Sequence, residues 1–550
     1  MNLIKYLKRV SVFSLALVVL TSAKSSDNNF EISKNLDIFH GIFRELDMYY
    51  VDSIDAEKII GVGIDAMLAA LDPYTDYYRE ADQNELKMMT TGKYAGIGAI
   101  IRQYKEKDYI SIEEPYEGMP AAKYGLKAGD LILAIDGVSM KGKSSSEVSN
   151  NLRGEPDSKF TITVKRLGFS DSLNFEITRS IIAMPAVPYY GIHKGVGYIV
   201  LDSFTENCSR DLRKAILELK AKGAKSLVLD LRGNGGGLLQ EAVDVVGLFV
   251  PKGTSVVETK GKIAQASRVY STRRDPLDSK IPLVVLVDES SASASEIVSG
   301  SLQDLDRAVI VGTRTFGKGL VQVTRSLPYD GTLKVTTSKY YIPSGRCIQE
   351  VDYSSRDKNG NAQNVPDSLI HVYKTASGRL VKDGGGIRPD VGCKLDTMPD
   401  ILYYLSTDVT LFNFVNEFCA KNNSIAPMDE FEVSDTLFQK FCDYIQESGF
   451  SFTSNSSKAL KSLKQIAEIE GLFDKAAGDF DALELKLQYD LKNDLNNFEE
   501  EIKKMLSISI ASRYYYQRGA IVQRLKDDIF FDDAVSILSD QKRYESILRP

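Results

Sequence analysis

Histidine is scarce in this chain, which has three in 550 residues. His40, His193 and His371 lie far apart and show no spacing typical of metal ligands, so we expect no metal site. Each is expected to be structural. His193 leaves open a Ser-His arrangement with a distant serine, because the members of a catalytic triad meet in space and not in sequence.

Cysteine shows no paired-spacing motif either, and the five cysteines are an odd number, so at least one is unpaired. Small buried hydrophobic side chains are the favoured interpretation for most of them. A cysteine nucleophile is not expected, since no histidine partner motif accompanies any of them. The five are Cys208, Cys347, Cys393, Cys419 and Cys442.

The N-terminus lacks an apolar run long enough to cross a bilayer. The stretch from Val10 to Leu20 is well short of the roughly 20 residues that a span requires. Three basic residues precede it and small residues end at Ala23, which is the pattern of a signal peptide over residues 1–23. We therefore expect export to the periplasm or cell envelope, or membrane association if this segment is not cleaved.

Basic charge is not in excess, because the formal net charge is -7 and cleavage of the leader would make it more negative. Nucleic-acid binding is therefore not expected. Hydrophobic residues make up 43% and charged residues 26%, as is usual for globular proteins. A chain of 550 residues is too long for one core, so three or four domains are expected.

A serine is placed as a nucleophile in Ser290-Ser-Ala-Ser-Ala-Ser-Glu296. Ser293 follows the apolar run Leu283 to Val287, a predicted buried strand, and precedes a helix-like stretch that ends at Leu305. Its hydroxyl is expected at a strand-to-helix turn, which presents a side chain outward at a helix N-terminus. The structural alternative is a Ser-x-x-Glu capping box that closes the helix.

A lysine is placed as a base in Gly317-Lys318-Gly319. Glycines lack side chains, so neighbouring backbone can approach and shield the amine of Lys318. Desolvation lowers the pKa of a lysine and lets it accept a proton from serine. The alternative is an ordinary turn with a solvated lysine.

A glycine-rich turn, Asp230-Leu-Arg-Gly-Asn-Gly-Gly-Gly237, follows a predicted strand from Ser226 to Leu229 and opens a helix. Its backbone amides are suited to hold a phosphate or a developing oxyanion. A phosphate loop would continue with Gly-Lys-Ser or Gly-Lys-Thr, and the chain continues with Gly237-Leu-Leu-Gln instead. An anion hole for catalysis is favoured, with a tight structural turn as the alternative.

These three elements, in this order, resemble the carboxy-terminal processing peptidases, also called tail-specific proteases. The resemblance covers about residues 30 to 395 and includes several further motifs. They are Leu71-Asp-Pro-Tyr-Thr-Asp-Tyr77, Tyr94-Ala-Gly-Ile-Gly98, Ala128-Gly-Asp-Leu-Ile-Leu-Ala-Ile-Asp-Gly137, Arg314-Thr-Phe-Gly-Lys-Gly-Leu-Val-Gln322, Tyr340-Tyr-Ile-Pro-Ser-Gly-Arg346 and Gly386-Ile-Arg-Pro-Asp390.

The resemblance implies a serine endopeptidase that forms an acyl-enzyme and needs no metal or organic cofactor. Ser293 would be the nucleophile, Lys318 the general base and Gln322 the residue that orients the lysine. The oxyanion would be held by the backbone N–H groups of Ala294 and Gly236.

Residues 92–168 combine short strands with turns and resemble a PDZ domain. In such a domain the C-terminus of a peptide adds as a strand after the loop Gly96, Ile97 and Gly98, whose amides hold the carboxylate. The expected partners are protein or peptide substrates with free C-termini. By analogy with relatives, Arg153 would link ligand occupancy to the active site. The alternative is a small β module that only packs against the core.

The expected fold is multidomain α/β. A helical N-terminal region over residues 24–91 precedes the PDZ-like β domain. An α/β serine-protease core, which the resemblance gives crotonase-like layers, follows over residues 169–395. A helical C-terminal region occupies residues 396–550.

A polar segment and an apolar stripe outside these motifs each predict a structure. The polar stretch from Asp352 to Asn364 is interpreted as a mobile loop. Apolar residues recur every three or four positions from Leu487 to Leu506, which predicts one long helix. Its apolar stripe would form either core or the contact of a homo-oligomer through the C-terminal helices.

The favoured function is therefore an exported endopeptidase that binds C-terminal tails and cuts nearby. A catalytically silent PDZ scaffold that binds tails is the alternative from another class. A hydrolase of small esters is less favoured, since Ser293 does not lie in a Gly-x-Ser-x-Gly elbow.

Overall fold

The computed structural model describes residues 28–103, 108–394, 398–487 and 490–549. The chain divides into two compact units, Met1–Tyr77 and Tyr78–Pro550. The predicted signal peptide, residues 1–23, lies outside the described residues. Over the ranges that are described, no helix has the length and apolar character that a membrane span requires.

The first unit is helical, as predicted. Residues 28–49 form one helix, and α2 (Ala56–Ala69) begins where the side chain of Asp55 accepts a hydrogen bond from the N–H of Lys58 at 3.1 Å. The apolar stripe of the first helix is largely exposed, with 51% for Phe39 and 56% for Ile42.

The second unit opens with α3 (Gln83–Thr91) and β2 (Lys93–Gly96), which lead into a small antiparallel sheet. Its strands, in spatial order, are β3 (Ala99–Arg102), β4 (Ser111–Pro115), β5 (Leu131–Ile135), β7 (Lys159–Lys165) and β8 (Leu173–Thr178), and β6 (Val138–Ser139) pairs with β5.

Buried side chains alternate with more exposed ones along β7, which is the pattern of a strand with one face on a core. Phe160, Ile162 and Val164 of β7 point into the core, where α4 (Pro120–Lys123) and α5 (Ser145–Leu152) also pack. The sheet extends past residue 168 through β8.

A second sheet spans residues 189–392, and five of its strands are parallel. Its spatial order is β10 (Tyr189–His193), β11 (Val196–Val200), β12 (Leu227–Asp230), β15 (Leu283–Val287), β16 (Val309–Gly312) and β23 (Val391–Gly392). β10 runs antiparallel to β11.

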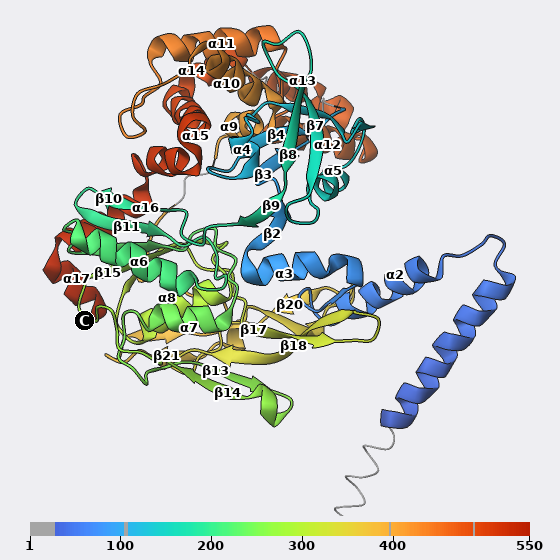
Figure 1. Ribbon diagram of the computed structural model, residues 1–550, viewed down its shortest axis with the longest axis vertical. Coiled ribbons are helices and arrows are strands. Elements are labelled where there is room, and N and C mark those ends of the chain that lie inside the picture. The colour runs from blue at the N-terminus through green and yellow to red at the C-terminus, as the bar shows by residue number, and fades with distance from the viewer. Residues whose placement is uncertain (1–27, 104–107, 395–397, 488–489, 550) are drawn as a thin grey trace, which may run out of the picture. The chain divides into compact units, whose positions relative to one another are not determined.

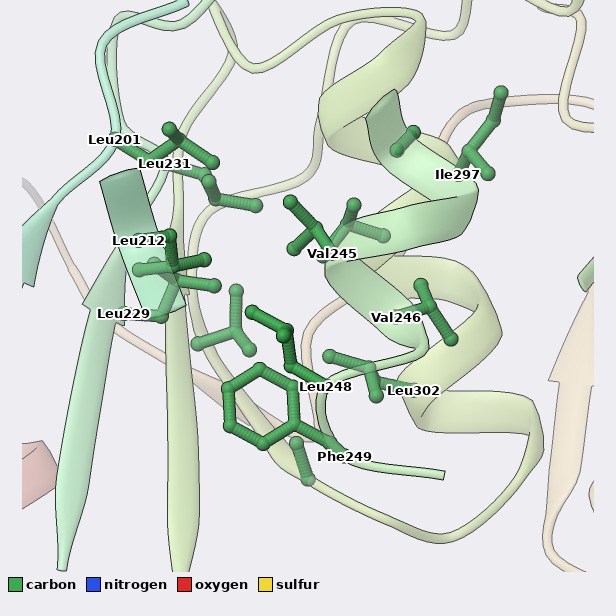
Figure 2. Packing of buried hydrophobic residues seen from close by; sticks show 14 of the residues in the cluster. Leu201, Leu212, Leu229, Leu231, Val245, Val246, Leu248, Phe249, Ile297 and Leu302 are labelled. Carbon is green, nitrogen blue, oxygen red and sulfur yellow. The ribbon is translucent and has the colours of Figure 1, made fainter. Parts of the chain in front are cut away.

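Helices cover both faces of this sheet (Figure 1). The helices on one face are α6 (Cys208–Ala221), α7 (Leu239–Val246) and α8 (Ala294–Asp304), and those on the other are the end of α15 (Glu499–Leu525), α16 (Ile529–Ser539) and α17 (Gln541–Leu548). Figure 2 shows Leu229, Val245 and Leu302 in the hydrophobic core between the sheet and the helices α6, α7 and α8. Burial on both faces explains why β12 and β15 are apolar without alternation.

A third sheet carries the segment that follows Lys318. It contains β13 (Ser255–Gly261), β14 (Arg268–Ser271), β17 (Leu320–Ser326) and β18 (Thr332–Tyr341), with β17 and β18 forming an antiparallel hairpin. The predicted α/β architecture is confirmed.

The interpretation of Asp352 to Asn364 as a mobile loop is wrong. The segment contains a hairpin of β19 (Val351–Arg356) and β20 (Ala362–Asn364), closed by the carboxylate of Asp357, which accepts hydrogen bonds from the N–H of Asn359 and Asn361 at 2.8 Å each. Every residue of these strands is half-buried or exposed and none is fully buried, so no apolar alternation marks them in the sequence.

The C-terminal region is helical, as predicted. Before α15 it contains α9 (Asp400–Thr407), α10 (Val409–Lys421), α11 (Asp435–Ser448), α12 (Asn455–Ile469), α13 (Phe473–Lys486) and α14 (Leu491–Asn497).

The single helix predicted over Leu487 to Leu506 is wrong, because Phe498, with φ -115 and ψ 29, separates α14 from α15. Leu495 and Ile502 from its stripe are buried in the core of this region. The stripe therefore serves as core, and a homo-oligomer through these helices stays a prediction.

Candidate active site

Ser293 occupies the turn between β15 and α8. Its φ of 55 and ψ of -109 lie outside the regions that L residues favour, so the turn is strained. The neighbouring sheet and helix hold this conformation, as in a nucleophile elbow. Its N–H donates to Oε2 of Glu296 at 2.8 Å, so Glu296 caps the helix as the structural alternative proposed. The capping contact and a catalytic role are compatible.

Glu296 does more than close a helix. Its side chain is fully buried and accepts four hydrogen bonds, of which the N–H of Ser293 is one. Oε1 accepts from Thr315 Oγ1 at 2.6 Å and from the N–H of Gly317 at 2.7 Å, and Oε2 accepts from the N–H of Lys318 at 2.9 Å. One carboxylate therefore connects the turn of the serine to the turn of the lysine.

Tyr340 makes a second connection between the same two turns. The side chain is 1% exposed, and its hydroxyl donates to the carbonyl oxygens of Ser293 at 3.1 Å and Lys318 at 2.7 Å. The sequence predicts only a capping role for Glu296, and it places Tyr340 only in a family motif. Contacts between residues so distant in sequence left no local signal that would have revealed these roles.

The glycines that flank Lys318 permit a close approach of backbone, as predicted. A Cβ on Gly319 would lie 2.8 Å from the N atom of Gln349, and one on Gly317 would lie 2.7 Å from Cβ of Glu350. The N–H of Gly319 also donates to Oε1 of Gln349 at 2.7 Å. The segment around Gln349 therefore packs directly on the lysine turn.

The glycine-rich turn lies against the serine. A Cβ on Gly236 would be 2.8 Å from Cβ of Ser293, and the φ of +105 also favours glycine. The N–H of Gly236 donates to Oδ1 of Asn234 at 2.9 Å in this structure. Within the described ranges, the N–H groups of Gly237 and Ala294 have no hydrogen-bond acceptor, so both are available to a ligand.

Asn234 is a further residue whose role the sequence does not predict. It is fully buried, and its Nδ2 donates to the carbonyl oxygen of Leu201 at 2.7 Å. Its own carbonyl oxygen accepts from the N–H of Ala292 at 3.0 Å and from Oγ of Ser295 at 2.8 Å. The asparagine thus fastens the glycine turn to the segment that carries Ser293.

A pocket of about 440 Å³ brings the five predicted catalytic residues together. Ser293, Lys318, Gln322, Gly236 and Ala294 all line it. Nε2 of Gln322 donates to Oγ1 of Thr336 at 3.0 Å. Much of the remaining wall is apolar, supplied by Leu86, Met89, Leu238, Leu239, Ile297, Leu320, Val321 and Val323.

His193 does not line this pocket. It ends β10, with Nε2 2.5 Å from the hydroxyl of Tyr189 and its ring edge-on to Phe531 of α16. Ser293 begins α8 on the opposite face of the sheet. The Ser-His alternative therefore has no geometric support.

A second, smaller cavity of about 170 Å³ lies in the PDZ-like domain, lined by α5 and by the segment from β2 to β3. Gly96, Ile97 and Arg153 are among its lining residues, whereas Gly98 packs on Met119. β3 is an edge strand of its sheet. A peptide strand therefore has room to pair with β3 beside α5.

The comparisons with known proteins agree with this architecture. Residues 195–354 match the model of Peptidase family S41, residues 111–166 that of a PDZ domain, and residues 401–538 that of "Probable PDZ-protease, C-terminal helical domain".

Two curated relatives each match 62% of this chain. A carboxy-terminal-processing protease of Bartonella bacilliformis is 37% identical over 342 residues, 62% of this chain and 78% of the relative. A probable CtpA-like serine protease of Staphylococcus aureus is 34% identical over 342 residues, 62% of this chain and 67% of the relative. A solved photosystem II D1 C-terminal processing protease has 29% identity and a TM-score of 0.36, covering 65% of this chain and 87% of that chain.

The fold and the matches define a serine-type peptidase with a PDZ domain. The chain belongs to peptidase family S41, among the carboxy-terminal-processing proteases. The resemblance that the sequence motifs indicated is confirmed.

We expect Gly236→Ala to abolish most activity, because the new methyl group would collide with the Ser293 turn. A loss of about 100-fold or more in kcat is expected for such a displacement. Gly253→Ala is the control, since Gly253 has a φ of +83 but nothing within 4 Å of its Cβ position. Equal activity of the two variants would contradict a tight contact between the glycine turn and the nucleophile.

Glu296 should make stability depend on pH. Burial raises its pKa from 4.5 to about 7, although its four hydrogen bonds oppose the shift. The folded state then holds the proton more tightly, so the free energy of unfolding falls as pH rises from 4.5 to about 7 and is constant above. This loss amounts to about 3 kcal/mol.

Glu296→Gln does not titrate and should lack this loss. Urea unfolding of both proteins at about pH 5 and about pH 8 measures it. The stability of the wild type minus that of the variant should be lower at the higher pH. A difference that is the same at both pH values would show that Glu296 does not titrate in this window.

Proposed function

We propose that this peptidase is an exported endopeptidase that cuts protein substrates near their C-terminal tails with a Ser-Lys dyad. The observation that carries the proposal is the common pocket of Ser293, Lys318 and Gln322, whose serine and lysine turns share the carboxylate of Glu296. Export is supported by the signal-peptide pattern of residues 1–23.

In the proposed reaction, the neutral amine of Lys318 accepts the proton of the Ser293 hydroxyl as the oxygen attacks a peptide carbonyl. Gln322 orients the amine. The lysine returns the proton to the leaving amine, and an acyl-enzyme remains. Water, deprotonated by the same lysine, then attacks the acyl carbonyl and breaks its ester bond to Ser293 Oγ. The lysine returns that proton to the serine oxygen, which restores the hydroxyl and the neutral amine and releases the shortened substrate.

The oxyanion of each tetrahedral intermediate requires N–H donors. Ala294 supplies one at the N-terminus of α8, where the helix dipole also favours negative charge. The glycine turn supplies the other. Gly237 has an N–H without an acceptor in the described structure, whereas Gly236 would first have to release Asn234.

Two surfaces of the protein are suited to bind a substrate. The apolar wall of the catalytic pocket suits apolar side chains at the cleavage site. The edge of β3 and the cavity beside α5 suit an extended peptide end, whose carboxylate would meet the amides of the loop from Gly96 to Gly98. Arg153 lines that cavity and also lies 5.3 Å from the ring centre of Tyr94.

Removal of either dyad member should abolish cleavage. We expect Ser293→Ala and Lys318→Ala each to lower kcat by about 10³-fold or more on an unfolded protein substrate. Ser279→Ala and Lys280→Ala are matched controls at adjacent exposed positions and should retain full activity. Cleavage by the dyad variants at the wild-type rate would end the proposal and favour a silent scaffold.

Tail recognition should depend on a free carboxylate. We expect amidation of the substrate C-terminus to raise KM about tenfold, because the loop amides lose a charged acceptor. Ser149→Trp fills the α5 side of the cavity and should remove the preference, so its KM should be the same for free and amidated substrates. Equal KM values for free and amidated substrates with the wild-type protein would exclude recognition of the terminus.

A further inference from the structure

The first part of the glycine-rich turn is held by carboxylates from two different regions of the chain. Nε and Nη2 of Arg232 donate to Oδ2 of Asp230 at 3.0 and 2.6 Å. Nη1 and Nη2 also donate to the two carboxylate oxygens of Asp528 at 3.0 and 2.6 Å. Asp230 ends β12 in the catalytic core, whereas Asp528 lies at the N-terminus of α16 in the C-terminal region.

Asp528 is itself fixed in place. Its Oδ1 accepts hydrogen bonds from the N–H of Phe530 at 3.0 Å and of Phe531 at 3.2 Å, so it caps α16. The guanidinium of Arg232 lies 5.2 Å from the ring centre of Phe530. The arginine is therefore bound by charge, by a two-point hydrogen bond and by an aromatic face of the same helix.

These groups are largely withdrawn from water. The side chains of Asp230, Arg232 and Asp528 are 6%, 22% and 11% exposed. Tyr198 adds a hydrogen bond from its hydroxyl to Oδ2 of Asp230 at 2.6 Å. Loss of one member would leave the opposite charge buried without its partner, so the cluster holds one geometry.

Arg232 is connected to the catalytic pocket through the turn itself. The next residue, Gly233, donates its N–H to the carboxylate of Asp288 at 3.0 Å, and Asn234 fastens the turn to the nucleophile segment. Gly236 then lies against Ser293. A displacement of the arginine would therefore move the backbone amides that face the reacting carbonyl.

We propose that Asp528 is a positioning residue for the peptidase reaction. Through Arg232 it holds the glycine turn in the geometry that the oxyanion requires. The C-terminal helical region thereby contributes to turnover without contacting the substrate. This inference rests on the proposed function of Ser293 and Lys318.

The test is Asp528→Asn in the full-length protein. Asparagine still caps α16 but loses the negative charge and one of the two acceptor oxygens that face the arginine. We expect kcat to fall about tenfold with KM unchanged. Affinity for a peptide boronic acid, which forms a tetrahedral adduct with the serine, should fall by a similar factor. Asp528→Glu should recover part of the loss.

Asp532→Asn is the matched control, because Asp532 lies one turn further along α16 and pairs with Lys194, away from the glycine turn. The kcat of this control variant should stay within about twofold of the wild-type value. Far-UV circular dichroism and thermal unfolding would show that both variants are folded. The double variant Arg232→Met/Asp528→Asn should be no less active than Arg232→Met alone, since the two residues act as one unit.

Three results would overturn the inference. The first is a kcat for Asp528→Asn within about twofold of wild type. The second is a raised KM for Asp528→Asn with kcat unchanged, and the third is an equal fall of kcat in Asp532→Asn. Failure of the proposed function looks different, because wild type and Ser293→Ala would then cleave equally. The two failures are therefore distinguishable in one set of assays.

Discussion

The proposed active site depends on the burial of one carboxylate. A charge removed from water is strongly destabilising unless donors surround it, and Glu296 obtains four of them from the two turns that carry Ser293 and Lys318. Neither turn alone supplies all four. The carboxylate is therefore satisfied only when the serine and lysine turns are both in place, and Tyr340 adds a neutral connection between the same segments.

A different constraint, the burial of apolar surface, explains why the sheet that carries Ser293 needs the C-terminal region. β12, β15 and β16 are apolar on both faces, and the helices of the core cover one face only. Side chains such as Val284 and Leu286 are buried on the other face by α16 and α17. Without these helices a large apolar surface would meet water, so the C-terminal region is part of the enzyme's core.

Local patterns were enough to predict much of this molecule. The run Leu283 to Val287 is β15, because strands buried on both faces are continuous in apolar residues. The motifs around Ser293, Lys318 and Gly236 predicted residues that share one pocket, since turns with glycine and a helix N-terminus carry a local signature.

The failures have physical causes. The hairpin of β19 and β20 has no fully buried residue, so its sequence shows no apolar alternation. The stripe from Leu487 to Leu506 continues across a break in the helix that packing tolerates. The contacts of Glu296, Asn234 and Tyr340 join distant segments. Sequence spacing carries no information about such partners.

The position of α3 gives the two binding surfaces a shared wall. Leu86 and Met89 of this helix line the catalytic pocket, whereas Met88, between them, lines the cavity of the PDZ domain. Nη2 of Arg153 lies 3.8 Å from Sδ of Met88, and the guanidinium also faces Tyr94. A peptide that entered the PDZ cavity would therefore press on a helix whose other side chains form the wall of the catalytic pocket. Packed helices transmit such displacements because protein interiors have little free volume.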